Sequence, residues 1–323
     1  MQPEVKSGPL SGPRVSVVIP TLNPGPASLR ALMHSLRAQI GVEVEVIVVD
    51  SSSTDGSNTV YDLADVWLTI PQAAFDHGGT RNVAARSATG SILVFMTQDA
   101  RPWNDTTLAT LAEPILERRA WAAYARQVAP PSAPLLERVA RDLNYPAASA
   151  LRSSEDIAQL GIRAFMLPNV ASAIDREVFG ALGGFPTPVV FNEDVQLANS
   201  ILSRGGRIAY VAEAIVEHGH HYRSLDLLRR YFDNGTSLAE AAEPLHSTAI
   251  NGVGAGFAMR QLRAVLATGR VDQVPRWTTE TGMKWVGYQL GRRHRRLPAS
   301  WKRALSLQPG FHVRNTVPGK HDR

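Results

Sequence analysis

Short runs of aliphatic and β-branched residues alternate with longer stretches of helical periodicity over the first hundred residues. The runs VSVVIP and VEVIVVD, residues 15–20 and 44–50, are typical of strands buried on both faces. Between them SLRALMHSLRAQI places apolar residues at helical spacing behind a cap at Ser28. The order strand, helix, strand predicts a parallel sheet flanked by helices.

The same reading extends along the chain. Two further strands are predicted at residues 65–70 and 91–97, with a helix over about residues 79–88 leading into the second. The later predicted elements are a helix at 106–119, a strand at 121–128, a strand at 169–174, a short helix at 176–182, an amphipathic helix at 192–203 and two short strands within 207–217. Beyond Ser224 the pattern is helical.

Composition narrows the class of protein. With 323 residues and 44% hydrophobic content, the chain can bury a sizeable core. It contains no cysteine, which excludes disulfides and thiolate metal sites. No apolar run approaches the roughly 18 residues of a membrane span, and the N-terminal residues lack the apolar stretch of a signal peptide. We therefore expect a soluble cytoplasmic protein.

Positive charge gathers toward the C-terminus. The formal net charge is +5, and residues 292–296 read RRHRR. Such a basic segment can bind nucleic acid, phosphate-bearing substrates or an anionic membrane surface. A solvated helix end explains the same segment equally well.

Polar residues follow three of the predicted strands. The first strand ends in Pro20 and is followed by Thr21 and Asn23, the second ends in Asp50 followed by Ser51, and the fourth is followed by Gln98 and Asp99. Each group alone fits a turn or a helix cap. Ligands collect at the carboxyl ends of strands in open parallel sheets, however, so three polar ends on one edge favour a binding site.

The motifs VSVVIPTLN, EVIVVDSSSTDGS, RNVAARSATGSILVFMTQDA and NEDVQLANSILSRGGRIAYVAEAIVEH occur in this order between residues 14 and 222. They resemble the family-2 inverting glycosyltransferases. The segments FDHGGTRN, TQDA, HGHHY and YQLGRRHRRLP resemble the bacterial rhamnosyltransferase branch, which uses dTDP-rhamnose. The resemblance implies an α/β GT-A fold, a Rossmann-like and mostly parallel sheet flanked by helices, with a C-terminal helical extension.

We accordingly expect four segments. They are a flexible N-terminus over residues 1–13, a GT-A catalytic domain over 14–223, a helical region over 224–308 and a flexible tail over 309–323.

The resemblance implies a divalent cation, Mg²⁺ or Mn²⁺, that stabilises a departing nucleotide diphosphate. Asp99 matches the last acidic residue of the family's Asp-x-Asp metal motif, and Gln98 stands where many relatives carry a second carboxylate. A histidine of the HGHHY segment is implied as a further ligand, with His220 preferred over His218. A surface histidine cluster without a ligand role is the alternative.

The resemblance places the catalytic base on Asp194, with Glu193 beside it to orient the acceptor. The alternative is that Asn192 caps a helix and both acids complement its dipole. For the donor, the resemblance implies contacts from Pro20, Thr21, Asn23, Asp50, Ser51, Asp76, His77, Arg81 and Gln98. Asp76 could equally cap the helix that follows it.

The implied reaction is inverting transfer of L-rhamnose from dTDP-β-L-rhamnose to a hydroxyl of a cell-surface glycan or lipid-linked oligosaccharide. A UDP-sugar donor, a nucleotidyltransferase and an inactive relative that binds membranes or anions are the alternatives. We expect no nucleic-acid partner. The aromatic residues Trp285, Tyr288, Trp301 and Phe311 could pack on the catalytic domain, form a homodimer face or rest on anionic lipid at the inner face of the plasma membrane.

Overall fold

The computed structural model describes residues 12–219, 223–250 and 253–314. Their strands form one sheet of nine, in the order β3-β2-β1-β4-β8-β6-β9-β5, with β7 beside β9. The strands are β1 (Arg14–Thr21), β2 (Glu43–Asp50), β3 (Val66–Thr69), β4 (Ile92–Met96), β5 (Ala100–Pro102), β6 (Ala122–Val128), β7 (Ala150–Arg152), β8 (Ala171–Asp175) and β9 (Ile208–His218).

The sheet has a parallel half and a mixed half. Strands β3, β2, β1 and β4 pair in parallel, as predicted from the alternation of strands and helices along this part of the sequence. Strand β8 is antiparallel to both β4 and β6, while β6 and β9 are parallel. The prediction of two short strands within residues 207–217 was wrong: β9 is continuous, and its register with β6 shifts between Ala125 and Arg126.

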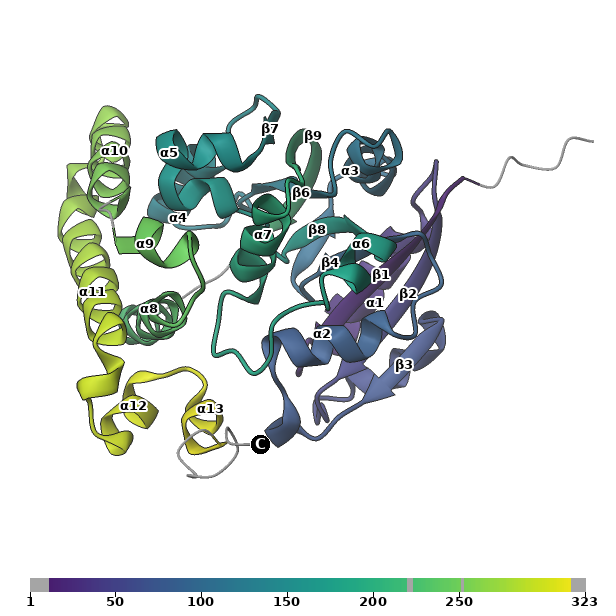
Figure 1. Cartoon of the computed structure of the whole chain (residues 1–323), viewed down its shortest axis with the longest axis horizontal. Helices are drawn as coiled ribbons and strands as arrows, with labels where there is room; N and C mark the ends of the chain where they lie inside the picture. Colours follow the sequence, from purple (N-terminus) through teal and green to yellow (C-terminus); the bar gives the residue numbers. More distant parts are fainter. Residues whose placement is uncertain (1–11, 220–222, 251–252, 315–323) are drawn as a thin grey trace, which may run out of the picture.

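Helices cover the sheet and extend to one side of it (Figure 1). They are α1 (Pro26–Arg37), α2 (His77–Ala85), α3 (Thr107–Leu116), α4 (Leu135–Asn144), α5 (Ile157–Leu160), α6 (Arg176–Ala181), α7 (Glu193–Ser203), α8 (Ser224–Ala239), α9 (Leu245–Ile250), α10 (Val253–Ala267), α11 (Val274–Arg292), α12 (Ala299–Leu305) and α13 (Pro309–Arg314). Short 3₁₀ segments are Ser57–Leu63, Gln72–Ala74, Ser154–Asp156, Gly161–Phe165, Val271–Gln273 and His294–Arg296.

The first helix begins earlier than predicted. Helix α1 starts at Pro26 with Gly25 as its N-cap, so Ser28 does not cap it. Proline suits this position because its fixed φ is helical and its missing N–H has no partner there anyway.

Two apolar clusters lie on the two faces of the sheet. Alternate residues of β1 divide between them, with Val17 and Ile19 on one face and Val18 on the other. Helices α1 and α3 pack on the first face, and helices α2, α6 and α7 pack on the second. The sheet is therefore a central layer, and its strand ends form the rim on which a site can be built.

The C-terminal helices gather beside this layered unit, on the left of Figure 1. Helices α8 and α11 approach closely because glycines face the neighbouring backbone. A Cβ atom on Gly287 would lie 2.2 Å from the Leu228 carbonyl oxygen, and one on Gly291 would lie 2.1 Å from that of Phe232. Residues 309–314, which we expected to belong to a flexible tail, form helix α13.

The four C-terminal aromatic residues have different surroundings. Tyr288 packs against the second apolar cluster, while Trp285 and Trp301 are 64% and 59% exposed. Within the described ranges, every helix falls short of the length and apolar character that a membrane span needs.

Candidate active site

A cavity of about 1190 Å³ opens at the carboxyl ends of β1 and β4, and it is larger than most small-molecule sites. Most of the predicted site residues meet there. Those that line it are Pro20, Thr21, Ser51, His77, Arg81, Gln98, Asp99, Glu193, Asp194 and His218. Among the described residues, Asn23, Asp50 and Asp76 are outside this lining, and His220 lies outside the described residues.

Asp50 ties the ends of β1 and β2 together. Its buried carboxylate accepts hydrogen bonds from Thr21 Oγ1 at 3.1 Å, from the Ser53 amide at 2.9 Å and from Ser53 Oγ. Asn23 extends this network: its backbone N–H donates to Ser53 Oγ, and its side-chain Oδ1 accepts from the backbone N–H of Thr54. These polar groups hold two loops at one edge, and the predicted donor contacts of Asn23 and Asp50 stay predictions.

Gln98 links the end of β4 to the loop after β1. Its Oε1 accepts from the Leu22 amide at 2.8 Å, and its Nε2 donates to the Leu22 carbonyl at 3.1 Å. A carboxylate here could accept the first bond but could not donate the second. The pairing explains physically why an amide rather than an acid precedes Asp99.

Asp99 and His218 come together where β5 pairs with β9. The Nε2 atom of His218 lies 3.5 Å from Asp99 Oδ1, and His218 is almost fully buried. Burial lowers the pKa of His218, although the nearby Asp99 opposes the shift. A neutral imidazole beside a carboxylate is a fitting donor pair for a divalent cation.

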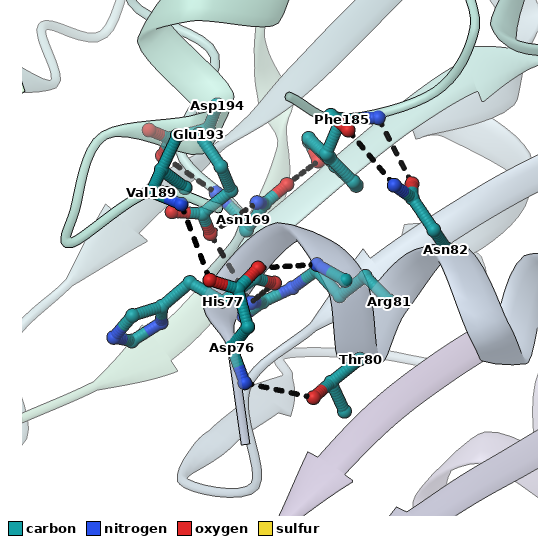
Figure 2. A network of polar contacts seen from close by, with 12 residues as sticks. Asp76, His77, Thr80, Arg81, Asn82, Asn169, Phe185, Val189, Glu193 and Asp194 are labelled. Carbon is teal, nitrogen blue, oxygen red and sulfur yellow. Dashed lines mark hydrogen bonds and ion pairs between the residues drawn. The ribbon is translucent and has the colours of Figure 1, made fainter. Parts of the chain in front are cut away.

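Figure 2 shows a second polar network, between α2 and α7. Arg81 donates to Glu193 at 3.1 Å and to the His77 carbonyl at 2.8 Å, and Asn169 Nδ2 donates to the same Glu193 oxygen at 3.0 Å. Both members of the ion pair are buried. Burial alone would raise the pKa of Glu193, but the Arg81 guanidinium and His77 hold it below its ordinary value. Glu193 is therefore an ionised, internally paired group.

Asp194 is surrounded differently, although it is the next residue. It is partly exposed to the cavity and accepts from the Val195 amide at 2.8 Å and from the Asn169 amide at 3.3 Å. Burial, and then the negative charge of Glu193, raise the pKa of Asp194 to about 7. A carboxylate with this pKa can take up and release a proton near neutral pH.

Asp76 is the N-cap of α2, the alternative that the sequence had left open. One of its oxygens accepts from the Gly79 amide at 2.7 Å and from Thr187 Oγ1, and the other accepts from the Val189 amide. It thereby joins α2 to the loop before α7. His77 follows; its ring lies nearly perpendicular to the rings of Phe75 and Phe191, and burial lowers its pKa.

Several cavity residues were not found from the sequence. Asn169 precedes β8 and contacts both acids of α7, while Gln127 and Arg141 lie behind His218. Gln308, from the segment before α13, reaches 3.5 Å from His77 Nε2. Asn169 and Gln127 were predicted only as parts of strands, and Arg141 and Gln308 lie outside the predicted strands.

Comparison with known proteins assigns the class. The profile of the family described as Glycosyl transferase family 2 matches residues 16–183. The chain belongs to this family of glycosyltransferases.

Among curated proteins it is similar to the O-antigen chain rhamnosyltransferase WbaN of Salmonella anatum, 33% identical over 93% of this chain and 96% of the relative. It is also similar to the O-antigen chain rhamnosyltransferase RfbN of Salmonella typhimurium, 31% identical over 92% of this chain and 96% of the relative.

Solved structures confirm the fold. The mannosyltransferase PcManGT from Pyrobaculum calidifontis, solved in complex with GDP-Man and Mn²⁺, has a TM-score of 0.55 and 22% identity, over 95% of this chain and 88% of that one. S. aureus TarS 1-349 in complex with UDP-GlcNAc has a TM-score of 0.53 and 16% identity, over 91% and 84%. The expected GT-A-like fold, with a mixed, largely parallel sheet and C-terminal helices, is confirmed.

Proposed function

We propose that this glycosyltransferase moves L-rhamnose from dTDP-β-L-rhamnose to a hydroxyl of a cell-surface glycan or lipid-linked oligosaccharide, with inversion. Two O-antigen rhamnosyltransferases, similar over nearly their whole length, support the choice of sugar. The observation that carries the chemistry is Asp194: a cavity-lining carboxyl whose pKa is raised to about 7, in the same cavity as the polar end of β4.

Asp194 acts as the base in this proposal. As a carboxylate it accepts the proton of the acceptor hydroxyl while that oxygen bonds to the anomeric carbon of the donor. The bond from that carbon to the diphosphate oxygen breaks on the opposite face, so the configuration inverts. The Asn169 and Val195 amides fix the carboxylate, and Glu193 stays paired with Arg81 and does not take the proton.

Asp99 and His218 are the residues that would hold a divalent cation, Mg²⁺ or Mn²⁺. Asp99 Oδ1 and His218 Nε2 lie 3.5 Å apart on the cavity wall. The carboxylate suits both ions, whereas the imidazole suits Mn²⁺ better than Mg²⁺, which prefers oxygen ligands. Among the described residues, no three histidine or acidic side chains are grouped so that they could hold a metal ion, so donor oxygens and water would complete the coordination. Bound there, the ion would supply positive charge to the leaving diphosphate. His220 stays a predicted ligand.

The nucleotide would lie along the strand ends, where Pro20, Thr21 and Ser51 line the cavity. Arg81 lines the same cavity, and its guanidinium, which is paired with Glu193, is the positive charge that we place near the diphosphate. Gln98 and His77 complete the wall.

A donor panel tests the proposal. Purified protein is offered dTDP-rhamnose and UDP-hexoses with a lipid-linked oligosaccharide, with and without chelator, and nucleotide diphosphate release is followed. We expect release from dTDP-rhamnose and tighter binding of dTDP than of UDP by calorimetry. Tighter UDP binding would overturn the assignment of the donor.

We also propose that the C-terminal helices rest on an anionic membrane surface. Trp285 and Trp301 are exposed, and Arg293, Arg295 and Arg296 near them in sequence are exposed as well. Flotation with phosphatidylglycerol vesicles should recover the protein, and the double variant W285S/W301S should stay behind. Trp103, equally exposed but in the sheet domain, provides the matched control W103S. If the wild type, W285S/W301S and W103S float equally well with the vesicles, the proposal is contradicted.

A further inference from the structure

A glutamine lies behind the histidine of the proposed cation site. Gln127, on β6, is 2% exposed, and its Oε1 lies 3.1 Å from Nδ1 of the equally buried His218. The two strands that carry these residues are hydrogen-bonded neighbours, with Gln127 opposite Val216. The contact therefore belongs to the rigid sheet and not to a loop.

Arg141, on α4, sets the orientation of the glutamine amide. Its Nη1 contacts Gln127 Oε1, and its Nη2 lies 3.9 Å from Glu137 one turn earlier on the same helix. A guanidinium has only donors, so it must face the amide oxygen and not the amide nitrogen. Oε1 is therefore an acceptor, and the His218 nitrogen that faces it must be the one that carries hydrogen.

This contact determines the tautomer of His218. A neutral imidazole has one N–H, and if Nδ1 donates to Gln127 then Nε2 presents its lone pair. Nε2 is the atom that lies 3.5 Å from Asp99 Oδ1. Two acceptor atoms then face each other, and a cation between them would be attracted by both.

We propose that Gln127 is a positioning residue that holds His218 in its Nδ1–H tautomer and so presents Nε2 to the divalent cation, with Arg141 holding the Gln127 amide in turn. The inference rests on the cation of the proposed function. It adds two residues that the strand-end motifs do not contain.

The test removes the acceptor and reads the cation directly. In Q127L we expect Mn²⁺ affinity, measured by electron paramagnetic resonance on the full chain without donor, to fall by about 10- to 100-fold. The ¹⁵N shifts of His218 should report protonated Nδ1 in the wild type and a mixture of tautomers in Q127L. Q127E keeps an acceptor for Nδ1–H and should bind Mn²⁺ within about threefold of the wild type.

Gln39 provides a matched control. It is buried, its Nε2 donates to the Asn104 carbonyl at 2.7 Å, and it is outside the cavity lining of the described residues. The variant Q39L loses a buried glutamine in the same way, and we expect its Mn²⁺ affinity to match the wild type.

Three results would overturn the inference. The first is Mn²⁺ affinity in Q127L equal to that of Q39L, and the second is protonated Nε2 in the wild type. The third is wild-type protein that binds no Mn²⁺ but still releases dTDP from dTDP-rhamnose in chelator, which removes the role of Gln127 and leaves the proposed sugar transfer standing. If the wild type binds Mn²⁺ but releases no dTDP from dTDP-rhamnose when Mn²⁺ is present, the proposed donor alone is contradicted.

Discussion

Asp50, at the end of β2, and Asp194, at the start of α7, are two carboxylates with opposite surroundings. Asp50 accepts hydrogen bonds from two hydroxyls and an amide, and it joins neighbouring loops. Asp194 accepts from two backbone amides and lies beside a second acid, which together with burial raises its pKa to about 7. The comparison teaches that a carboxylate that accepts three hydrogen bonds holds neighbouring loops together. A carboxylate next to a second negative charge can instead take up and release a proton near neutral pH.

The largest effect should come from removing the proton acceptor. In D194N we expect kcat to fall by about 10²- to 10⁴-fold, because an amide cannot take the proton of the acceptor hydroxyl. Affinity for dTDP, measured by calorimetry, should stay within about twofold, since Asp194 does not lie at the strand ends. Turnover that survives this change would show that another group is the base.

The next largest effect should be on stability. E193Q leaves the buried Arg81 without its charge partner, and we expect the free energy of unfolding in urea to drop by about 3–5 kcal/mol. The exposed Arg270–Asp272 pair is the matched control, and D272N should leave the urea midpoint unchanged. Equal midpoints for E193Q and D272N would contradict a structural role for Glu193.

A smaller loss of stability should follow from changing Asp50. D50N replaces one acceptor oxygen with a donor that faces the Ser53 amide or hydroxyl, and we expect unfolding to become easier by about 1–3 kcal/mol. The kcat of this variant should fall far less than that of D194N. A collapse of kcat without any loss of stability would place Asp50 in the chemistry instead of in the contacts that hold the loops together.

The sequence predicted the parallel half of the sheet well because its signal is local. Buried strands such as β1 and β2 are continuous β-branched runs, and each is followed by residues suited to turns. Asp76 shows the limit of this reading. Its position predicted either a cap or a ligand contact, and only the Gly79 amide that donates to the Asp76 carboxylate identified the cap.

The rest could not be predicted because it depends on contacts between distant residues. Asn169, Gln127 and Arg141 occupy ordinary positions in sequence, and their contacts with Glu193 or His218 arise from sheet order and helix placement. Helix α4 was missed because it follows a proline-rich stretch, and β7 because a three-residue strand carries too little pattern. The close packing of Gly287 on Leu228 likewise has no local signal.

The dependence of kcat/KM on pH tests the role of Asp194 most directly. We predict a rate that is constant above about pH 7 and falls about tenfold per pH unit below it, because the protonated form of Asp194 cannot accept a proton. In E193Q the bend should move to lower pH, since the charge that helps to raise the pKa of Asp194 is gone. Two results would contradict the assignment of Asp194 as the base: a kcat/KM that does not change between about pH 5.5 and 8.5, or a pH profile of E193Q that bends at the same pH as that of the wild type.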